Sequence, residues 1–416
     1  MSSIKWSFAA VLLLAGCAPA AIGSSGTAAN SGPSANDSLR PATSLASSPT
    51  TQATGAFARI ASMSTLRSGH TATLLADGRV LIAAGVQMQG GTTTELESAE
   101  TFDPASGTFS PTGSLTTSRS VHAAALLADG RVLVVGGTNF RNGSFTAITS
   151  AETYDPRTGD FISTGPLATS RTLPTATLLT DGRVLIAGGS ILQGGTTTAL
   201  ASAELFDPRT NTFSSTGPMT TARFLDTATL LDDGRVLIVG GFNPTSGVAG
   251  PIGAAELYDP RTGTFSQTGS LMTPRFGHTA TLLTDGRILV AGGADISNGV
   301  PVSLASAELF DPRTSTFSST GSMAAAHAVQ SAARLASGQV LVVGGADLSS
   351  GSPIALATAE LFDAPAGVFL RTASMTSARE SNTITALADG TVLITGGDSV
   401  SDDVQTGLGT AELFRP

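Results

Sequence analysis

Residues 129–137 read Asp-Gly-Arg-Val-Leu-Val-Val-Gly-Gly, and close copies of this stretch recur along the chain at a constant step of 52 residues. The copies begin at Asp77, Asp129, Asp181, Asp233, Asp285, Ser337 and Asp389. Asp-Gly between two apolar runs is a strong hairpin signal, and the continuous Val-Leu-Val-Val run predicts a strand covered on both faces. Seven copies without an insertion indicate a repeat architecture, and a period near 50 residues favours a β-propeller over a helical solenoid.

Four strand-like runs follow one another in every unit. In residues 119–170 they are 121–127, 132–135, 151–154 and 160–167, joined by an Asp-Gly turn, a thirteen-residue variable loop and an Asp-Pro turn. This pattern predicts one antiparallel blade per unit. A small residue recurs in the first run, as expected for the strand that crowds round the axis of a propeller. It is found as Ala72, Ala124, Ala176, Ala228, Ala280 and Ala332.

The two ends of the repeated region each hold part of a unit. Residues 55–63 match fourth-strand sequence and have no strands before them, whereas the last unit stops at Pro416, after its third strand. We therefore expect residues 55–63 to pair with the strand at 410–414 and to close the ring within one blade. Closure removes exposed sheet edges, which otherwise invite aggregation.

Two charged columns keep the same 52-residue step. A glutamate stands in every third strand, and an arginine precedes the first strand of every unit except the sixth, which has His327. A buried glutamate is costly without a partner, and the arginine column offers one of equal periodicity. We interpret the columns as a structural ring of charged hydrogen bonds, because catalysis rarely needs seven copies of one pair. Members of the ring include Arg119, Glu152, Arg171, Glu204, Arg223, Glu256, Arg275 and Glu308.

The motifs of the unit resemble kelch repeats. The shared features are the Gly-Gly doublet after an apolar strand, the Glu-Leu-Phe/Tyr-Asp-Pro word, a later aromatic residue and the closing arginine, over about residues 55–416. The resemblance implies an all-β fold, a seven-bladed kelch-type β-propeller with four antiparallel strands per blade. The sequence departs from the pattern in the outer strand, where the aromatic residue, commonly tryptophan in kelch repeats, is phenylalanine, as at Phe109 and Phe161.

The first 54 residues predict an exported protein with a lipid anchor. Residues 1–17 read as a signal peptide that ends in Leu-Ala-Gly-Cys, a word that resembles the lipobox of bacterial lipoproteins. The resemblance implies acylation of Cys17, the only cysteine, and attachment to a bacterial membrane, on the periplasmic or the cell-surface side of the outer membrane. Residues 18–54 are almost entirely small and polar, so we expect a flexible linker.

Composition argues against several kinds of chemistry. The net charge is −9 and no basic block is present, which argues against binding to nucleic acid. His70, His122 and His278 share one repeat position in blades spread round the ring, and a single cysteine cannot form a Cys-based metal site. We therefore predict no metal and no cofactor. Copper-radical sugar oxidases also contain kelch-like propellers, but they need a tyrosine cross-linked to a cysteine, and Cys17 lies in the lipobox.

The thirteen-residue loops between the second and third strands differ freely in sequence, as binding loops on a rigid scaffold do. Three extra phenylalanines lie in or beside the loop of blade 4, two of them next to column arginines, which is the composition of an interaction hot spot. The alternative is that these rings pack the loops onto one another. The predicted partner-binding residues are Phe140, Phe145, Arg223, Phe224, Phe242, Arg275 and Phe276.

Together these features predict a monomeric, non-enzymatic envelope lipoprotein whose propeller binds a protein or a surface polymer. The alternative function is a periplasmic carbohydrate-processing enzyme, of the epimerase or mutarotase kind, that uses the propeller channel.

Overall fold

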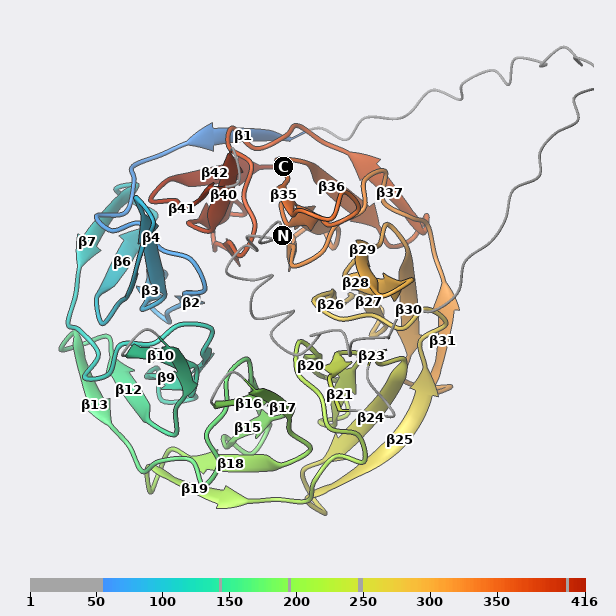
Figure 1. The fold of residues 1–416 in the computed structure, drawn as a ribbon, viewed down its shortest axis with the longest axis horizontal. Helices are drawn as coiled ribbons and strands as arrows, with labels where there is room; N and C mark the ends of the chain where they lie inside the picture. Colours follow the sequence, from blue (N-terminus) through green and yellow to red (C-terminus); the bar gives the residue numbers. More distant parts are fainter. Residues whose placement is uncertain (1–54, 142–143, 194–195, 246–249, 402–403) are drawn as a thin grey trace, which may run out of the picture.

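Seven four-stranded antiparallel sheets form a closed ring in the computed structural model (Figure 1). The structure describes residues 55–141, 144–193, 196–245, 250–401 and 404–416, so the predicted signal peptide and linker lie outside the described residues. Every regular element in these ranges is a β-strand. Within them no helix is long and apolar enough to cross a membrane. The predicted seven-bladed β-propeller is confirmed.

The strands of each blade run in order from the channel to the rim of the ring. Blade 1 consists of β2 (Thr71–Leu74), β3 (Val80–Ala83), β6 (Ala99–Asp103) and β7 (Thr108–Pro111). Blade 2 consists of β8 (Ala123–Leu126), β9 (Val132–Val135), β12 (Ala151–Asp155) and β13 (Asp160–Ser163). Blade 3 consists of β14 (Thr175–Leu178), β15 (Val184–Ala187), β18 (Ala203–Asp207) and β19 (Thr212–Ser215). Blade 4 consists of β20 (Thr227–Leu230), β21 (Val236–Val239), β24 (Ala254–Asp259) and β25 (Thr264–Ser270).

The remaining blades repeat the pattern. Blade 5 consists of β26 (Thr279–Leu282), β27 (Ile288–Ala291), β30 (Ala307–Asp311) and β31 (Thr316–Ser319). Blade 6 consists of β32 (Ser331–Arg334), β33 (Val340–Val343), β36 (Ala359–Asp363) and β37 (Val368–Arg371). Blade 7 consists of β38 (Thr383–Ala386), β39 (Val392–Thr395), β42 (Ala411–Arg415) and β1 (Ala56–Arg59).

Blade 7 confirms the predicted closure of the ring. β1 pairs antiparallel with β42, with Phe57 opposite Phe414 and the two ring centroids 4.9 Å apart. The pairing continues beyond the strand, because the backbone N–H of Ile60 donates to Ala411 at 3.1 Å. Segments from the two ends of the repeated region therefore share one sheet.

The seven segments expected as variable loops between the second and third strands each form a two-stranded hairpin. The hairpins are β4 (Val86–Gln89) with β5 (Thr92–Glu95), β10 (Thr138–Arg141) with β11 (Ser144–Ala147), β16 (Ser190–Gln193) with β17 (Thr196–Ala199), β22 (Phe242–Asn243) with β23 (Gly250–Pro251), β28 (Ala294–Ser297) with β29 (Val300–Ser303), β34 (Ala346–Asp347) with β35 (Ile354–Ala355), and β40 (Asp398–Ser401) with β41 (Val404–Gly407). They share one face of the ring with the blade-to-blade connections, which we call the hairpin face. The opposite face, which carries the Asp-Gly and Asp-Pro turns, is the turn face.

The core lies between neighbouring blades. Val184 and Ile186 of β15 pack against Leu133 and Val135 of β9, and β15 is buried along its whole length. Such burial contributes about 1.5–3 kcal/mol for each large apolar side chain. At the outer edge of every blade, a third-strand aromatic ring meets a fourth-strand phenylalanine with centroids 4.8–5.0 Å apart. Phenylalanine therefore fills the outer-strand aromatic position in every blade.

The first glycine of each Gly-Gly doublet lies against the following blade. A Cβ on Gly136 would lie 2.6 Å from the carbonyl oxygen of Arg171, and φ at this glycine is +65°. Both conditions favour glycine, which has no Cβ and adopts positive φ without strain. Blade 1 departs from the rule, because Ala84 occupies the same position with φ of 57° and is fully buried.

Replacement of Ala84 by glycine is therefore expected to stabilise the protein, by about 0.5–1 kcal/mol after the entropy of the unfolded chain is included. Equilibrium unfolding in denaturant of the wild type and of Ala84→Gly measures the difference. Gly136→Ala is the reciprocal control and should destabilise. A lower stability for Ala84→Gly would show that the packing of the alanine methyl group outweighs the strain in its backbone.

Candidate functional site

The charged columns form buried ion pairs that join each blade-to-blade connection to its blade. In blade 3, Arg171 Nη1 donates to the carbonyl oxygens of Gly188 at 2.8 Å and Ser202 at 3.0 Å, and Nη2 donates to Glu204 Oε1 at 2.9 Å. The second oxygen of Glu204 accepts the backbone N–H of Ala168 at 2.8 Å. Burial lowers the pKa of the Arg171 guanidinium, while the Glu204 charge opposes that shift.

The same arrangement recurs in five other blades. The pairs are Arg67–Glu100 at 2.9 Å, Arg119–Glu152 at 3.0 Å, Arg223–Glu256 at 2.8 Å, Arg275–Glu308 at 3.1 Å and Arg379–Glu412 at 2.9 Å. In blade 6, His327 Nδ1–H donates to Gly344 O at 2.6 Å, and its Nε2 lies 3.9 Å from Glu360. The Nη atoms of these arginines and the paired carboxylates are engaged within the protein and are buried, which supports a structural role.

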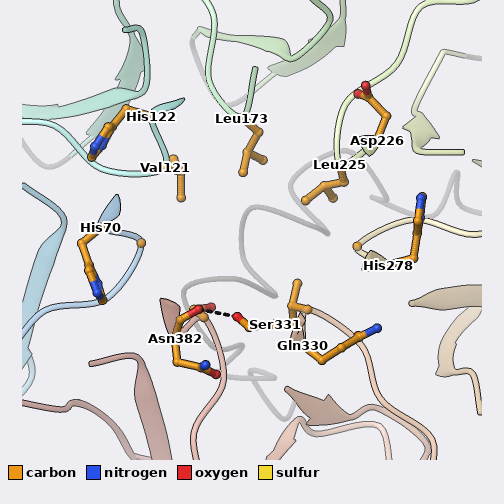
Figure 2. Close-up of a pocket in the computed structure, with 14 residues that line it drawn as sticks. His70, Val121, His122, Leu173, Leu225, Asp226, His278, Gln330, Ser331 and Asn382 are labelled. Carbon is orange, nitrogen blue, oxygen red and sulfur yellow. Dashed lines mark hydrogen bonds between the residues drawn. The ribbon is translucent and has the colours of Figure 1, made fainter. Parts of the chain in front are cut away.

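The histidine position lines a cavity of about 320 Å³ at the channel mouth, on the hairpin face (Figure 2). Its wall contains two residues from most blades, those two and three positions after the column arginine or histidine. The lining residues are Gly69, His70, Val121, His122, Leu173, Leu225, Asp226, Gly277, His278, Val329, Gln330, Ser331, Ser381 and Asn382.

The three histidines reach sideways into the seams between blades instead of converging on the axis. His122 Nε2 lies 2.9 Å from Thr71 Oγ1 of the preceding blade, and His278 Nε2 lies 3.0 Å from Thr227 Oγ1. His70 makes the equivalent contact with Thr383 at 3.1 Å. Burial lowers the pKa of His70 and His278 to about 3, so both rings are neutral. In the described parts of the chain, no group of three or more His, Cys, Asp or Glu side chains is placed to hold a metal ion.

Asp226 is the one carboxylic acid at this repeat position. Its side chain is buried, and neither carboxylate oxygen accepts a hydrogen bond from another described residue. Burial raises the pKa of Asp226 to about 7, against the opposing charge of Arg223. A buried acid without a hydrogen-bond donor favours its neutral form.

This carboxyl makes the stability of the propeller depend on pH. Because its folded pKa is raised, the folded state binds the proton more tightly than the unfolded state between about pH 4 and pH 7. The free energy of unfolding should therefore fall as pH rises through that window. Asp226→Asn cannot ionise, and asparagine already occupies this position in blade 7 as Asn382. The variant should be more stable at pH 8 by up to about 4 kcal/mol, with a flatter melting curve against pH. Parallel curves for the two proteins would contradict the assignment.

The predicted hot spot is wrong in one respect, because three of its phenylalanines are not exposed. The exposed fractions of Phe224, Phe242 and Phe276 are 1%, 2% and 3%. The rings meet edge to face, with centroids 5.8 Å apart for the first pair and 5.3 Å for the second. They pack the hairpin of blade 4 onto the adjoining connections, within an apolar cluster that includes Ala294 and Leu348. The three rings therefore follow the alternative prediction, in which they pack the loops onto one another.

The arginines of the predicted hot spot are also buried. Arg223 and Arg275 have no exposed surface and are held by Glu256 and Glu308. Phe140 and Phe145 differ, because they are half-buried on β10 and β11 with centroids 4.7 Å apart. A partner-binding role for these two residues stays a prediction.

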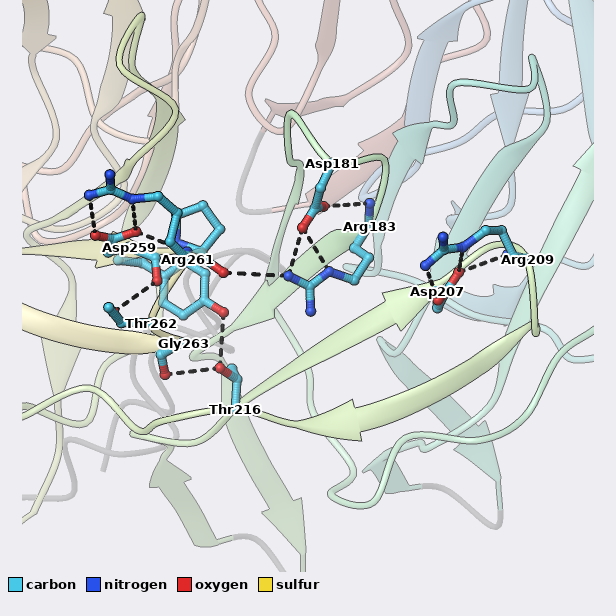
Figure 3. A network of polar contacts seen from close by, with 11 residues as sticks. Asp181, Arg183, Asp207, Arg209, Thr216, Asp259, Arg261, Thr262 and Gly263 are labelled. Atoms are coloured by element: carbon cyan, nitrogen blue, oxygen red, sulfur yellow. Dashed lines mark hydrogen bonds and ion pairs between the residues drawn. The ribbon is translucent and has the colours of Figure 1, made fainter.

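The turn face carries a network of Asp–Arg pairs that sequence reasoning did not single out (Figure 3). Arg183 pairs with Asp181 at 2.6 Å and also donates to the carbonyl oxygen of Pro260 in the next blade at 3.5 Å. In the outer turns, Arg209 lowers the pKa of Asp207 to about 2 by hydrogen bonding. The sequence pattern that could have predicted these pairs is the recurrence of Asp-Gly-Arg and Asp-Pro-Arg, in which the arginine stands two residues after the aspartate. These pairs support the turns and link neighbouring blades.

Comparisons with known proteins agree with this architecture. No family model matches the chain. The chain is 35% identical over 118 residues to spermatocyte protein spe-26 of Caenorhabditis elegans, covering 28% of this chain and 20% of that protein. It is 33% identical over 117 residues to an F-box/kelch-repeat protein of Arabidopsis thaliana, covering 28% of this chain and 30% of the relative. Over this part of the chain, the repeats are thus similar to those of a kelch-repeat protein.

The solved structures extend the fold comparison to most of the ring. A fungal alcohol oxidase of the AA5 family, in complex with copper, superimposes with a TM-score of 0.68 over 87% of this chain and 76% of that one. The identity of 18% shows a shared fold alone. The β-propeller thus spans the described residues, while this chain covers at most three-tenths of the curated relatives' length.

Proposed function

We propose that this kelch propeller is a non-enzymatic interaction module, tethered by lipid at the bacterial envelope, that binds a protein partner through its hairpin face. The observation that carries the proposal is the contrast between constant blades and variable hairpins. Blades repeat nearly the same buried pairs and the same core, whereas hairpins change their side chains from blade to blade and have shorter strands in blades 4 and 6. Variable side chains on a rigid frame are typical of binding surfaces.

The hairpins of blades 5 and 6 each offer one exposed apolar side chain. Val300 on β29 is 44% exposed and Ile354 on β35 is 52% exposed. The two hairpins are in contact through β29 and β34. Exposed apolar residues on neighbouring hairpins, next to a packed apolar cluster, are suited to a protein interface.

The kelch relatives support an interaction role, since one of them is named as an F-box/kelch-repeat protein. The channel mouth supports a non-enzymatic reading, because its histidines are held in the seams and do not converge. The capture experiment described below distinguishes a surface polymer from a protein partner.

The envelope location rests on residues 1–54, which lie outside the described residues. The lipobox-like word at Cys17 supports acylation, and no other cysteine is available. Cys17→Ser should release the protein from the membrane fraction, because a single strong anchor is then lost. Retention of this variant in the detergent phase on partitioning would contradict the lipid tether.

Partner capture should depend on the exposed hairpin residues. Val300→Ser combined with Ile354→Ser is expected to reduce capture of an envelope protein by at least tenfold and to leave the melting temperature nearly unchanged, because both side chains are largely in solvent. Capture from crosslinked cells followed by mass spectrometry measures this. Ile162→Ser is the matched control, because Ile162 is 60% exposed but lies on the outer strand β13. Equal loss in the control, or unchanged capture in the double variant, would contradict the proposal, and enrichment of polysaccharide would indicate a polymer ligand.

A further inference from the structure

A collar of residues surrounds the channel mouth with unusual backbone geometry. The residue two positions after each column arginine or histidine has φ in the left-handed region in all seven blades. The values are 58° for Gly69, 46° for Val121, 52° for Leu173, 57° for Leu225, 60° for Gly277, 48° for Val329 and 53° for Ser381.

Hydrogen bonds between blades hold the collar in this geometry. The backbone N–H of Val121 donates to Gly69 at 2.8 Å, and that of Leu173 donates to Val121 at 3.0 Å. On the other side of the ring, Gly277 donates to Leu225 at 3.0 Å. Val329 donates in turn to Gly277 at 2.9 Å, so the backbone N–H groups of Val121, Leu173, Gly277 and Val329 are engaged by the neighbouring blade.

Five blades place a side chain where glycine fits without strain. Left-handed φ costs a residue other than glycine about 1–2 kcal/mol, and β-branched residues such as Val121 and Val329 are particularly uncommon there. Blades 1 and 5 show that the ring accepts glycine at this position. Strain that the fold does not require is found mainly at functional sites.

The strained side chains form an aliphatic wall. Val121, Leu173 and Leu225 belong to consecutive blades and turn toward the channel, and all three are half-buried (Figure 2). The polar residues behind the collar point into the seams, as the contact between Gln330 Nε2 and Ala291 O at 2.7 Å shows. The cavity therefore presents mainly aliphatic carbon. Its volume of about 320 Å³ is about twice the roughly 150 Å³ that holds benzene in an apolar cavity.

We infer that the channel mouth is a binding site for a small uncharged apolar molecule of one or two rings. The aliphatic arc of blades 2–4 and Val329 of blade 6, which lines the same cavity, pack against the molecule, and burial of its surface drives binding. Ser381, beside the gap at Gly69, places one hydroxyl on the opposite part of the wall. This site is separate from the hairpin tips and does not depend on a protein partner.

Indole is a suitable probe of this site, and the full chain is the protein to use. Indole should raise the melting temperature of the wild type and shift the methyl resonances of Val121, Leu173 and Leu225. Val121→Gly combined with Val329→Gly should weaken the indole Kd by at least tenfold. Because glycine relieves left-handed strain, the variant alone should melt no lower than the wild type.

Ser381→Gly provides the matched control, because it removes a side chain at the same backbone position without removing aliphatic surface. This variant should keep its response to indole within a few-fold of wild type. An unshifted melting temperature and unperturbed methyl resonances in the wild type would overturn the inference. Equal indole affinity in the Val121→Gly, Val329→Gly variant would overturn it as well.

Discussion

A chain that lacks residues 55–63 is expected to lose more than about 5 kcal/mol of unfolding free energy, or to fail to fold as a ring. The deletion removes β1 and leaves the edge of β42 without its partner strand. It also removes the burial of Phe57, which alone contributes about 1.5–3 kcal/mol, and the backbone hydrogen bonds from Ile60 to Ala411 and from Met63 to Gly409.

Thermal and denaturant unfolding measure this loss, and size-exclusion chromatography detects association through the exposed edge. Deletion of residues 18–54 is the control, because it shortens the chain before the first described residue. An unchanged melting temperature after deletion of residues 55–63, or an equal loss in the control, would show that the ring does not depend on β1.

Arg171→Met is expected to destabilise the protein by about 3–5 kcal/mol. The substitution leaves the buried Glu204 carboxylate without its cation and removes the donor from the carbonyl oxygens of Gly188 and Ser202. Removal of one member of a buried ion pair costs this much because the remaining charge is uncompensated.

Two comparisons separate burial from charge. The double variant Arg171→Met, Glu204→Leu should recover part of the loss, since it removes both charges together. Arg157→Met breaks a pair in which the arginine side chain is 82% exposed, and it should leave the melting temperature nearly unchanged. Equal effects of Arg171→Met and Arg157→Met would contradict a structural role for the buried column.

The blades could be predicted from sequence because the same physical constraint is repeated in every unit. Apolar residues at consecutive positions, as in Val184–Ala187, require cover on both faces, and only neighbouring blades supply it. Closure was predictable because residues 55–63 carry fourth-strand sequence without strands before them. The Arg–Glu pairs followed from their equal period and from the cost of burying an unpaired charge.

The hairpins were missed although four of the segments carry a Gly-Gly or Asn-Gly turn signal in the sequence, at residues 90–91, 142–143, 194–195 and 298–299. Gly90-Gly91 and Asn298-Gly299 adopt positive φ between paired strands, as two-residue hairpin turns require. Their flanking strands, such as Thr92–Glu95, are polar and do not alternate with apolar residues, so the periodic signal was weak. Without the hairpin pairing, the burial of Phe242 could not be inferred, because pairing with the connection is what places Phe224 and Phe242 face to edge.

The channel collar could not be predicted from the sequence at all. Val121, Leu173 and Leu225 precede strands and have the composition of ordinary β residues. Their left-handed φ arises from hydrogen bonds between blades, which depend on the closed ring and not on local sequence.

The most direct test of the interaction role is site-specific photo-crosslinking in cells that make the full chain. A photoreactive phenylalanine analogue replaces Val300 or Ile354 on the hairpin face, and, in control chains, Ile162 or Val368 on the outer strands, where the exposed fractions are 60% and 41%. The proposed function predicts one and the same protein adduct from both hairpin positions and none from the outer strands. Adducts of equal yield from all four positions, or adducts from the outer strands alone, would contradict a binding site on the hairpin face.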